Sequence, residues 1–386
     1  MTVGLSSFGL SAFNEHALGG LVLSSHEHTW EMENNTGANL PFLKRLRNFV
    51  NMSYYIYYYY YYALIPNQQK LAEKYFGLLP PLLDVLKNVS LLFINQADVM
   101  IAARPKLANI ITYTSSHIEK KLTPLPKDLE AFLDGATNGF IYFSLGNNAR
   151  SVSLPLEIRR VFCDVFTKLS YKLSGNSRRI FPGILIMFTL ENGSHNKLSN
   201  ESYQFAAHPN IKLFICQGGL QSSEETVHYE VPVLGFAIFA DQDYQVARME
   251  ALSIGECLEI TTLKKDELEN TITDLITNKK FIVDYSSKSF SDMQRILYIR
   301  NVVQDTPYDP VENLAWWTEY VIRTKGAPHL RSSLAFQPWY QRCDLDIVVF
   351  LTITIFLIAS TTFYLTAKTF VYIHKNIKST EKQKIS

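Results

Sequence analysis

Cysteine is scarce in this chain, which has 4 cysteines among 386 residues. Cys163, Cys216, Cys257 and Cys343 lie far apart, and no two of them form a CxxC pair. Zinc sites and disulfide frameworks both need closely or regularly spaced cysteines, so this spacing indicates neither. We therefore expect no metal site and no fold that depends on disulfides.

An excess of one charge is also lacking. The chain has 37 lysine and arginine residues against 36 aspartate and glutamate residues, a formal net charge of +1. A nucleic-acid partner usually requires a clustered basic face, so we expect no nucleic-acid partner. Hydrophobic residues make up 47% of the chain, which predicts a mainly globular protein, and its length suits about two domains.

Charge is absent altogether from Ile347–Ala367, IVVFLTITIFLIASTTFYLTA. This segment is long enough to cross a bilayer as a helix, and it lacks the polar face of a helix in a soluble core. Acidic residues precede it and lysines follow it. The positive-inside rule therefore places the tail in the cytosol and the large N-terminal part outside it. The lysines are Lys368, Lys375, Lys378, Lys382 and Lys384.

The last five residues, KQKIS, place lysines third and fifth from the end. This spacing resembles the dilysine retrieval signal of endoplasmic reticulum membrane proteins, and a merely basic juxtamembrane tail is the alternative. We expect a single-pass protein of the endoplasmic reticulum membrane with a large lumenal domain and a short cytosolic tail.

Residues 1–20 show no secretory signal, because a basic n-region is missing and Glu15 and His16 interrupt the apolar stretch. If the chain entered the membrane only by its C-terminal segment, the large N-terminal part would stay in the cytosol. Asn-x-Ser/Thr sequons are compatible with a lumenal glycoprotein and occur at Asn34, Asn51, Asn88, Asn192 and Asn200. We expect that the natural N-terminus extends further upstream.

From residue 137 onward, strand-like runs alternate with helical patterns, which predicts an α/β fold with a parallel, doubly wound sheet. The runs are FIYFSL, ILIMFTL, IKLFICQ and PVLGFAI. In such folds ligands bind beyond the carboxyl ends of the strands. The predicted parts are an incomplete N-terminal acceptor-side domain (1–125), a linker (126–136), a C-terminal domain (137–330), a juxtamembrane segment (331–346), the transmembrane helix (347–367) and a basic tail (368–386).

The stretch Phe214–His228, FICQGGLQSSEETVH, joins a strand through two glycines to the start of a helix. Free backbone N–H groups and the positive end of a helix dipole together favour an anion. An ordinary βα turn with no ligand is the alternative, because a lone Gly-Gly turn is weak evidence.

Around this stretch the sequence resembles the UDP-glycosyltransferase family, most closely its insect branch. The resemblance is carried by HPNIKLFICQGGLQSSEETVHYEVPVLGFAIFADQDYQVARMEALSIG, by FIYFSLGNNARS and by DTPYDPVENLAWWTEYVIRTKGAPHLRSSLAFQPWYQRCDLDIVVF. It implies a GT-B-like fold of two Rossmann-like domains, the N-terminal one incomplete here. It further implies metal-free transfer of a hexosyl group, with inversion, to small lipophilic acceptors in detoxification. The donor is a co-substrate, UDP-glucose or UDP-glucuronate, with the insect-like motif favouring UDP-glucose.

The resemblance assigns roles to the residues of the glycine turn. Gln217 stands where many members have a histidine that faces the pyrophosphate; it keeps a hydrogen-bond donor but no positive charge. Gly219 corresponds to a glycine that permits close backbone approach. Gln221 and Ser222 correspond to residues that face the phosphates.

Further residues follow from the same resemblance. Glu225 matches the carboxylate that accepts hydrogen bonds from the ribose hydroxyls. Asp241 and Gln242 match the pair that reads the sugar hydroxyls. Ser144 and Gly146 line the opposing turn.

The chain departs from the family pattern in places. Leu198, Asn200 and Glu201 replace a W-x-P-Q stretch that packs on uracil, and loss of an aromatic stack costs about 1–3 kcal/mol. Glu230 replaces a glycine, where it strains the turn and adds negative charge.

The family's catalytic histidine and its aspartate both align upstream of Met1, so no catalytic residue is assigned here. We expect His16, His26 and His28 to be surface or packing histidines. Since a general base supplies roughly 10²–10⁴-fold, we expect little or no sugar transfer by the chain as written. An inactive, membrane-anchored member that forms homo- or hetero-oligomers with other members is the alternative. An unrelated tail-anchored α/β protein is a third.

Overall fold

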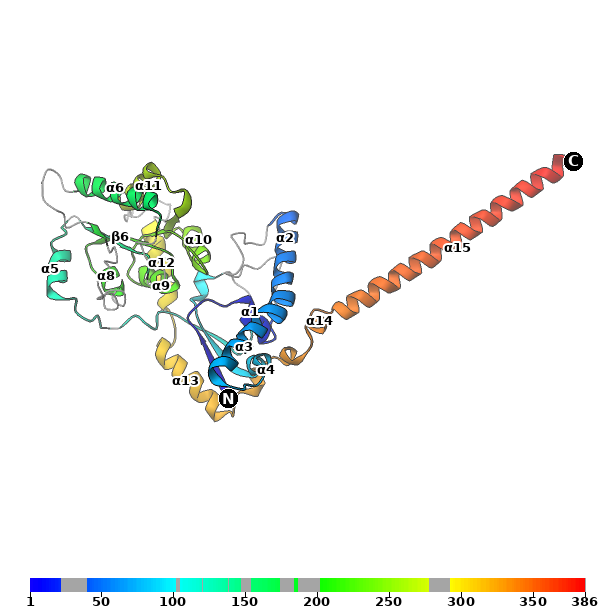
Figure 1. The fold of residues 1–386 in the computed structure, drawn as a ribbon, viewed down its shortest axis with the longest axis horizontal. Helices are drawn as coiled ribbons and strands as arrows, with labels where there is room; N and C mark the ends of the chain where they lie inside the picture. The colour runs from blue at the N-terminus through cyan, green and yellow to red at the C-terminus, as the bar shows by residue number, and fades with distance from the viewer. Residues whose placement is uncertain are drawn as a thin grey trace. The chain divides into compact units, whose positions relative to one another are not determined.

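Two parallel β-sheets organise the chain in this computed structural model (Figure 1). The structure describes residues 1–21, 40–101, 105–119, 121–137, 139–146, 154–173, 184–186, 202–277 and 292–385. They fall into two compact units, Met1–Ser332 and Ser333–Ser386. Both sheets belong to the first unit, which also contains the predicted site.

The first sheet has the order β1-β2-β3, with β1 at Thr2–Ser6, β2 at Val89–Asn95 and β3 at Ile110–Tyr113. The second has the order β5-β4-β6-β7-β8. Its strands are β4 (Phe140–Ser144), β5 (Ile184–Ile186), β6 (Ile211–Cys216), β7 (Val233–Gly235) and β8 (Gly255–Cys257). All pairings are parallel. The sheets confirm the predicted α/β class and the strands predicted around residues 140, 184, 211 and 233.

The helices that precede β4 include a π-helix, η1, in the tyrosine-rich stretch. They are α1 (Ala12–Ala17), α2 (Phe42–Ser53), η1 (Tyr54–Leu64), α3 (Ile65–Phe76), α4 (Leu82–Lys87), η2 (Asp98–Met100) and α5 (Lys127–Asp134). The later ones of the first unit are α6 (Leu156–Leu173), α8 (Ser202–Ala206), α9 (Leu220–His228), α10 (Gln242–Ala251), η5 (Ile260–Thr262), α11 (Lys265–Thr277), α12 (Asp292–Gln304), α13 (Pro310–Arg323) and η6 (Pro328–Leu330).

The second sheet is covered on both faces because its central strands are mainly apolar and alternate their side chains between the faces. Ile141, Phe143 and Ile215 pack toward α6 and α11, while Tyr142 and Phe214 pack toward α8, α9 and α12. The same division of helices is visible in Figure 1. The carboxyl ends are in register, with Ser144 beside Cys216 and Cys216 beside Gly235.

Helix α13 packs on the first sheet, not the second. Val321 is buried against Leu91 and Phe93 of β2. The sequence placed these residues in the C-terminal domain, since no local pattern shows that the chain returns to an earlier sheet. The predicted domain boundaries otherwise stay predictions.

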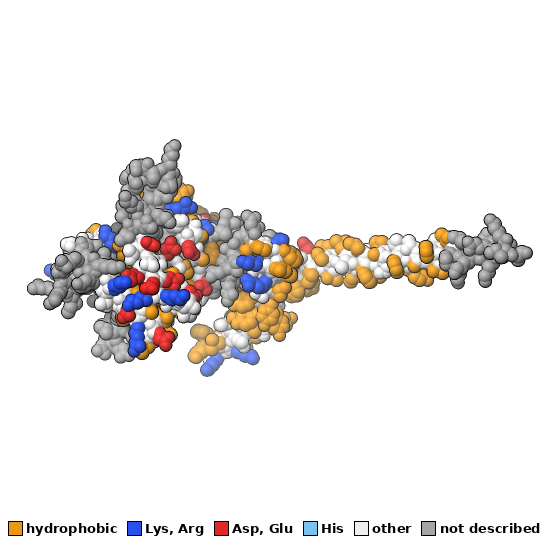
Figure 2. Space-filling model, turned by 90° about the horizontal axis from the view of Figure 1, so that it is seen from above, with side chains coloured by type: hydrophobic (Ala, Val, Ile, Leu, Met, Phe, Trp, Pro, Cys, Tyr) orange, Lys and Arg blue, Asp and Glu red, His pale blue; other side chains and the backbone are white. Residues whose placement is uncertain are grey.

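The second unit contains η7 (Ser333–Phe336), α14 (Trp339–Arg342) and the long helix α15 (Leu345–Ile385). Its segment Leu345–Ile373 is long and apolar enough to span a membrane, and none of it is buried within the protein. Figure 2 shows hydrophobic side chains along this helix. The helix extends beyond the predicted 347–367 because the basic tail continues it.

Candidate functional site

The residues predicted from the sequence line one cavity of about 300 Å³ at the carboxyl ends of β4 and β6. Those residues are Ser144, Gly146, Gln217, Gly219, Gln221, Ser222, Glu225, Asp241 and Gln242. Ser7 and Phe8, which follow β1 of the first sheet, also line it. The cavity is therefore built from both sheets.

The turn between β6 and α9 depends on a glycine that the motif contains but that we did not assign to the site. Gly218 has a φ of +82°, and its N–H donates to Cys216 Sγ at 3.3 Å. A Cβ at this position would lie 2.2 Å from Val246 Cγ2. Gly218 thus shapes the turn, whereas Gly219 has an ordinary φ of −62°.

The N-terminus of α9 opens into this cavity without a side-chain cap at Gly219. The first intrahelical bond runs from Ser223 N–H to the Gly219 carbonyl at 3.0 Å. The N–H groups of Leu220, Gln221 and Ser222 precede it and remain available for a ligand. With the positive end of the helix dipole, they form an anion site.

The two glycine turns meet through Gln217. Ser144 Oγ accepts from Gly146 N–H at 3.2 Å, which closes the turn after β4. Gly146 has a φ of +65°, and a Cβ there would lie 2.5 Å from Gln217 Nε2. Gln217 Oε1 is buried and has no hydrogen-bond partner among the described residues. This acceptor is therefore open to a ligand donor.

Asp241 and Gln242 differ in whether a side-chain oxygen is available to accept a hydrogen bond from a ligand. Gln242 Oε1 accepts from the N–H groups of Ile238 and Phe239 at 3.0 and 3.1 Å, so this oxygen holds the loop. Asp241 is 4% exposed, and its Oδ2 has no partner within the described part of the chain. Burial raises the pKa of Asp241. A sugar hydroxyl that donates to Asp241 Oδ2 would satisfy this buried acceptor.

Glu225 is 3% exposed and lies beside residues that sequence reasoning missed. His117 Nε2 is 3.5 Å from Glu225 Oε1, and His117 Nδ1 is 3.5 Å from Glu224 Oε2. Glu224 also accepts from Thr114 Oγ1 at 2.6 Å and Asn95 Nδ2 at 3.2 Å. Burial raises the pKa of Glu224. The carboxyl edge of the first sheet thus holds both glutamates.

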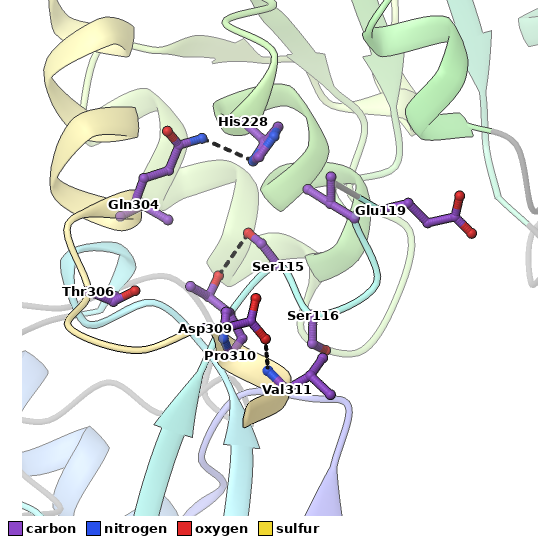
Figure 3. Close-up of a pocket in the computed structure, with 12 residues that line it drawn as sticks. Ser115, Ser116, Glu119, His228, Gln304, Thr306, Asp309, Pro310 and Val311 are labelled. Carbon is purple, nitrogen blue, oxygen red and sulfur yellow. Dashed lines mark hydrogen bonds between the residues drawn. The ribbon is translucent and has the colours of Figure 1, made fainter. Parts of the chain in front are cut away.

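A second cavity of about 400 Å³ is lined by residues that follow β3 and by residues at the end of α12 and the start of α13 (Figure 3). Its lining includes Ser115, Ser116, Glu119 and Asp309. Asp309 Oδ1 caps α13 by accepting from Val311 N–H at 3.0 Å and from the next N–H at 3.2 Å. Because this helix start is already occupied by a carboxylate, the second cavity does not suit a diphosphate.

The departures from the family pattern have mixed outcomes. Glu230 adopts a φ of +61°, as strain at a glycine position predicts. Its carboxylate pairs with Arg300, which offsets the added negative charge, and Glu230 is not among the described residues that line the cavity at β4 and β6. Leu198, Asn200 and Glu201 lie outside the described residues.

His16 is a packing histidine, as predicted. It is 3% exposed, and its Nε2 is 2.9 Å from Tyr61 Oη in an aromatic cluster with Tyr57 and Tyr60. His26 and His28 lie outside the described residues. No histidine is among the described residues that line the cavity at β4 and β6.

Comparison with protein families matches residues 9–384 to the model of UDP-glucoronosyl and UDP-glucosyl transferase. The chain is 32% identical over 315 residues to "UDP-glycosyltransferase UGT5" of Dactylopius coccus, covering 81% of this chain and 56% of that protein. It is 28% identical over 284 residues to "UDP-glucuronosyltransferase 3A1" of Mus musculus, covering 71% of this chain and 50% of that protein. The chain thus spans about half the length of these relatives.

Among solved structures, a spinosyn forosaminyltransferase aligns with a TM-score of 0.44 at 12% identity, over 67% of this chain and 66% of that chain.

Proposed function

Because the chain belongs to the UDP-glucoronosyl and UDP-glucosyl transferase family, we propose that the cavity at β4 and β6 binds a UDP-sugar. The proposed reaction transfers the hexosyl group, glucose or glucuronate, to a small lipophilic acceptor with inversion. The observation that carries the proposal is the cavity itself. It joins an uncapped helix start, which suits a diphosphate, to the buried carboxylates of Glu225 and Asp241, which suit hydroxyl groups.

Each part of the donor has a proposed partner. The N–H groups at the start of α9 and the side-chain Nε2 group of Gln217 donate to the phosphate oxygens. Glu225 accepts from the ribose hydroxyls. Asp241 accepts from the sugar hydroxyls through its buried Oδ2, and Gln242 holds the adjoining loop. Helix amides carry the diphosphate here because no lysine or arginine is among the described residues that line the cavity.

We further propose that this 386-residue chain binds the donor but transfers sugar slowly. An acceptor hydroxyl needs a general base, which contributes roughly 10²–10⁴-fold. The described lining of the cavity contains no histidine, and His16 is committed to its tyrosine cluster. The same observation supports the second candidate, a membrane-anchored member without activity of its own that associates with active relatives.

For the location, we propose the endoplasmic reticulum membrane, with α15 as a single-pass anchor, the large unit lumenal and the tail cytosolic. The support is the exposed apolar segment Leu345–Ile373, followed by the lysines of the tail.

The test is calorimetric titration of UDP into the full chain in detergent micelles, with the variant Glu225→Gln. We expect saturable binding that weakens roughly tenfold or more in the variant, because hydrogen bonds to a charged group contribute about 1.5–3 kcal/mol. Glu250→Gln is the matched control, since Glu250 is exposed on α10. Absence of UDP binding by the wild type would contradict the proposal. Turnover with a phenolic acceptor at the rate of an active relative would contradict the expectation of slow transfer.

A further inference from the structure

We propose that His117 is a positioning residue for the donor site, which holds Glu225 in place for the ribose hydroxyls by sharing its charge between Glu225 and Glu224. The inference rests on the proposed function, because it takes Glu225 as the ribose acceptor. His117 itself is not among the residues that line the cavity, so it acts through Glu225.

The geometry places one imidazole between two adjacent carboxylates. Each nitrogen of His117 is 3.5 Å from one carboxylate oxygen, Nδ1 from Glu224 and Nε2 from Glu225. Both glutamate side chains are 4% exposed, and the histidine side chain is 23% exposed. Buried carboxylates on consecutive residues repel each other unless a cation is shared between them. The protonated imidazole of His117 supplies that shared cation.

The second glutamate is fixed by the first sheet. Thr114 and Asn95 donate hydrogen bonds to the two oxygens of Glu224, at 2.6 and 3.2 Å. Glu224 therefore gives His117 a fixed partner on one side, and the ring points its other nitrogen at Glu225. By this arrangement, a segment of the first sheet sets the position of a ligand-binding carboxylate on α9 of the second.

A positioning role for His117 predicts effects on binding that a simple packing role does not predict. Loss of the imidazole leaves two neighbouring negative charges, which displaces Glu225 and weakens only the contact to the ribose hydroxyls. If the negative charge of Glu224 is removed together with the imidazole, Glu225 has no neighbouring carboxylate to repel it and keeps its position. The effect of the histidine should therefore depend both on the ribose hydroxyls of the ligand and on the charge of Glu224.

The experiment titrates UDP and 2′,3′-dideoxy-UDP into the full chain in detergent micelles. For His117→Gln we expect UDP to bind about tenfold more weakly, which corresponds to about 1.4 kcal/mol. The affinity for 2′,3′-dideoxy-UDP should be unchanged, since this ligand lacks the hydroxyls that Glu225 accepts from. In the double variant His117→Gln/Glu224→Gln the affinity for UDP should return most of the way to that of the wild type.

Three results separate this inference from the proposed function. If the wild type binds no UDP, the proposed function fails and the inference fails with it. If UDP binding depends on Glu225 but not on His117, the inference alone is wrong. If His117→Gln weakens both ligands equally and the double variant gives no recovery, His117 has only a packing role, and the inference is again wrong.

Discussion

His117 Nε2 lies 3.5 Å from Glu225 Oε1, and this contact joins the segment after β3 to α9, the helix that begins at the proposed donor site. The two residues are far apart in the sequence: His117 follows β3 of the first sheet, and Glu225 lies in α9, which packs on the second sheet. Through this contact the first sheet helps to position a residue of the proposed donor site. The ionisation of His117 therefore links the geometry of the site to pH.

The first prediction concerns this pH dependence. Burial lowers the pKa of His117, but Glu225 and Glu224 together outweigh burial, so its pKa is raised. The pKa of Glu224 is also raised, chiefly by burial. A raised folded-state pKa stabilises the protein fully below the unfolded value and loses that effect as the pH rises through the folded value. We therefore expect both stability and UDP affinity to fall as the pH rises above about 6.5.

The measurement is the midpoint of thermal unfolding and the UDP dissociation constant from about pH 5 to 8.5, the range in which histidine titrates. His228 also faces His117, and burial, Arg300 and His117 lower its pKa, so its own contribution is lost as the pH falls. Tyr113 and Tyr229 have raised pKa values and stay neutral in this range. The difference between the pH profiles of the wild type and of His117→Gln/Glu224→Gln gives the contribution of His117 and Glu224. Equal slopes in the two proteins would contradict the prediction.

The second prediction separates the two glycines of the turn. In Gly218→Ala, the new Cβ meets Val246 Cγ2 at 2.2 Å in a left-handed backbone, which should lower the free energy of unfolding by about 2–5 kcal/mol. In Gly219→Ala the φ of −62° suits alanine and the nearest atom would be 3.6 Å away. Gly219→Ala should lower the free energy of unfolding by about 1 kcal/mol or less, since alanine is a poor N-cap. It should nevertheless weaken UDP binding, because Gly219 lines the cavity and its new methyl group would lie at the start of α9.

Denaturant unfolding and calorimetric titration of the two variants check this. The two variants are matched, because each adds one methyl group and the two positions are adjacent. A stability loss at Gly219 as large as that at Gly218 would show that the strain is not local to the left-handed residue.

The β6–α9 turn could be predicted from the sequence because its determinants are local. An apolar run, two glycines and polar residues at a helix start occur within Phe214–His228, and the observed strand, turn and helix follow that order. The cavity could be anticipated too, since parallel strands bring Ser144 and Gln217 to one edge.

The contact of His117 with Glu224 and Glu225 could not be predicted in this way. In the sequence, Ser115 to His117 is an ordinary polar loop, and two consecutive glutamates in a helix normally predict a solvated face. Their burial results from docking of the first sheet, a contact between residues distant in the sequence that no local period records. The return of α13 to β2 escaped prediction for the same reason.

The third prediction concerns the sugar half of the donor. In Asp241→Asn, the buried Oδ2 that has no described partner loses its charge, so a sugar hydroxyl is bound less strongly. We expect UDP-glucose affinity to fall roughly tenfold, as for a lost hydrogen bond to a charged group, while UDP affinity stays within about twofold. Asp243→Asn is the control, because Asp243 is exposed in the first turn of α10. Equal losses for UDP and UDP-glucose would place Asp241 at the nucleotide instead of the sugar.

The fourth prediction concerns α15. Ile355 and Ile358 are exposed in the middle of the apolar segment, at 66% and 62%. An arginine at the centre of a membrane helix costs about 2.5–3.5 kcal/mol, so Ile355→Arg/Ile358→Arg should destabilise insertion by roughly twice that. We expect alkaline carbonate to release this variant from microsomes while the wild type stays in the membrane pellet. Ile355→Leu/Ile358→Leu keeps the apolar surface and should behave as the wild type. Because arginine on a helix outside the bilayer would have no such effect, retention of the arginine variant would show that the chain is held to the membrane by another segment.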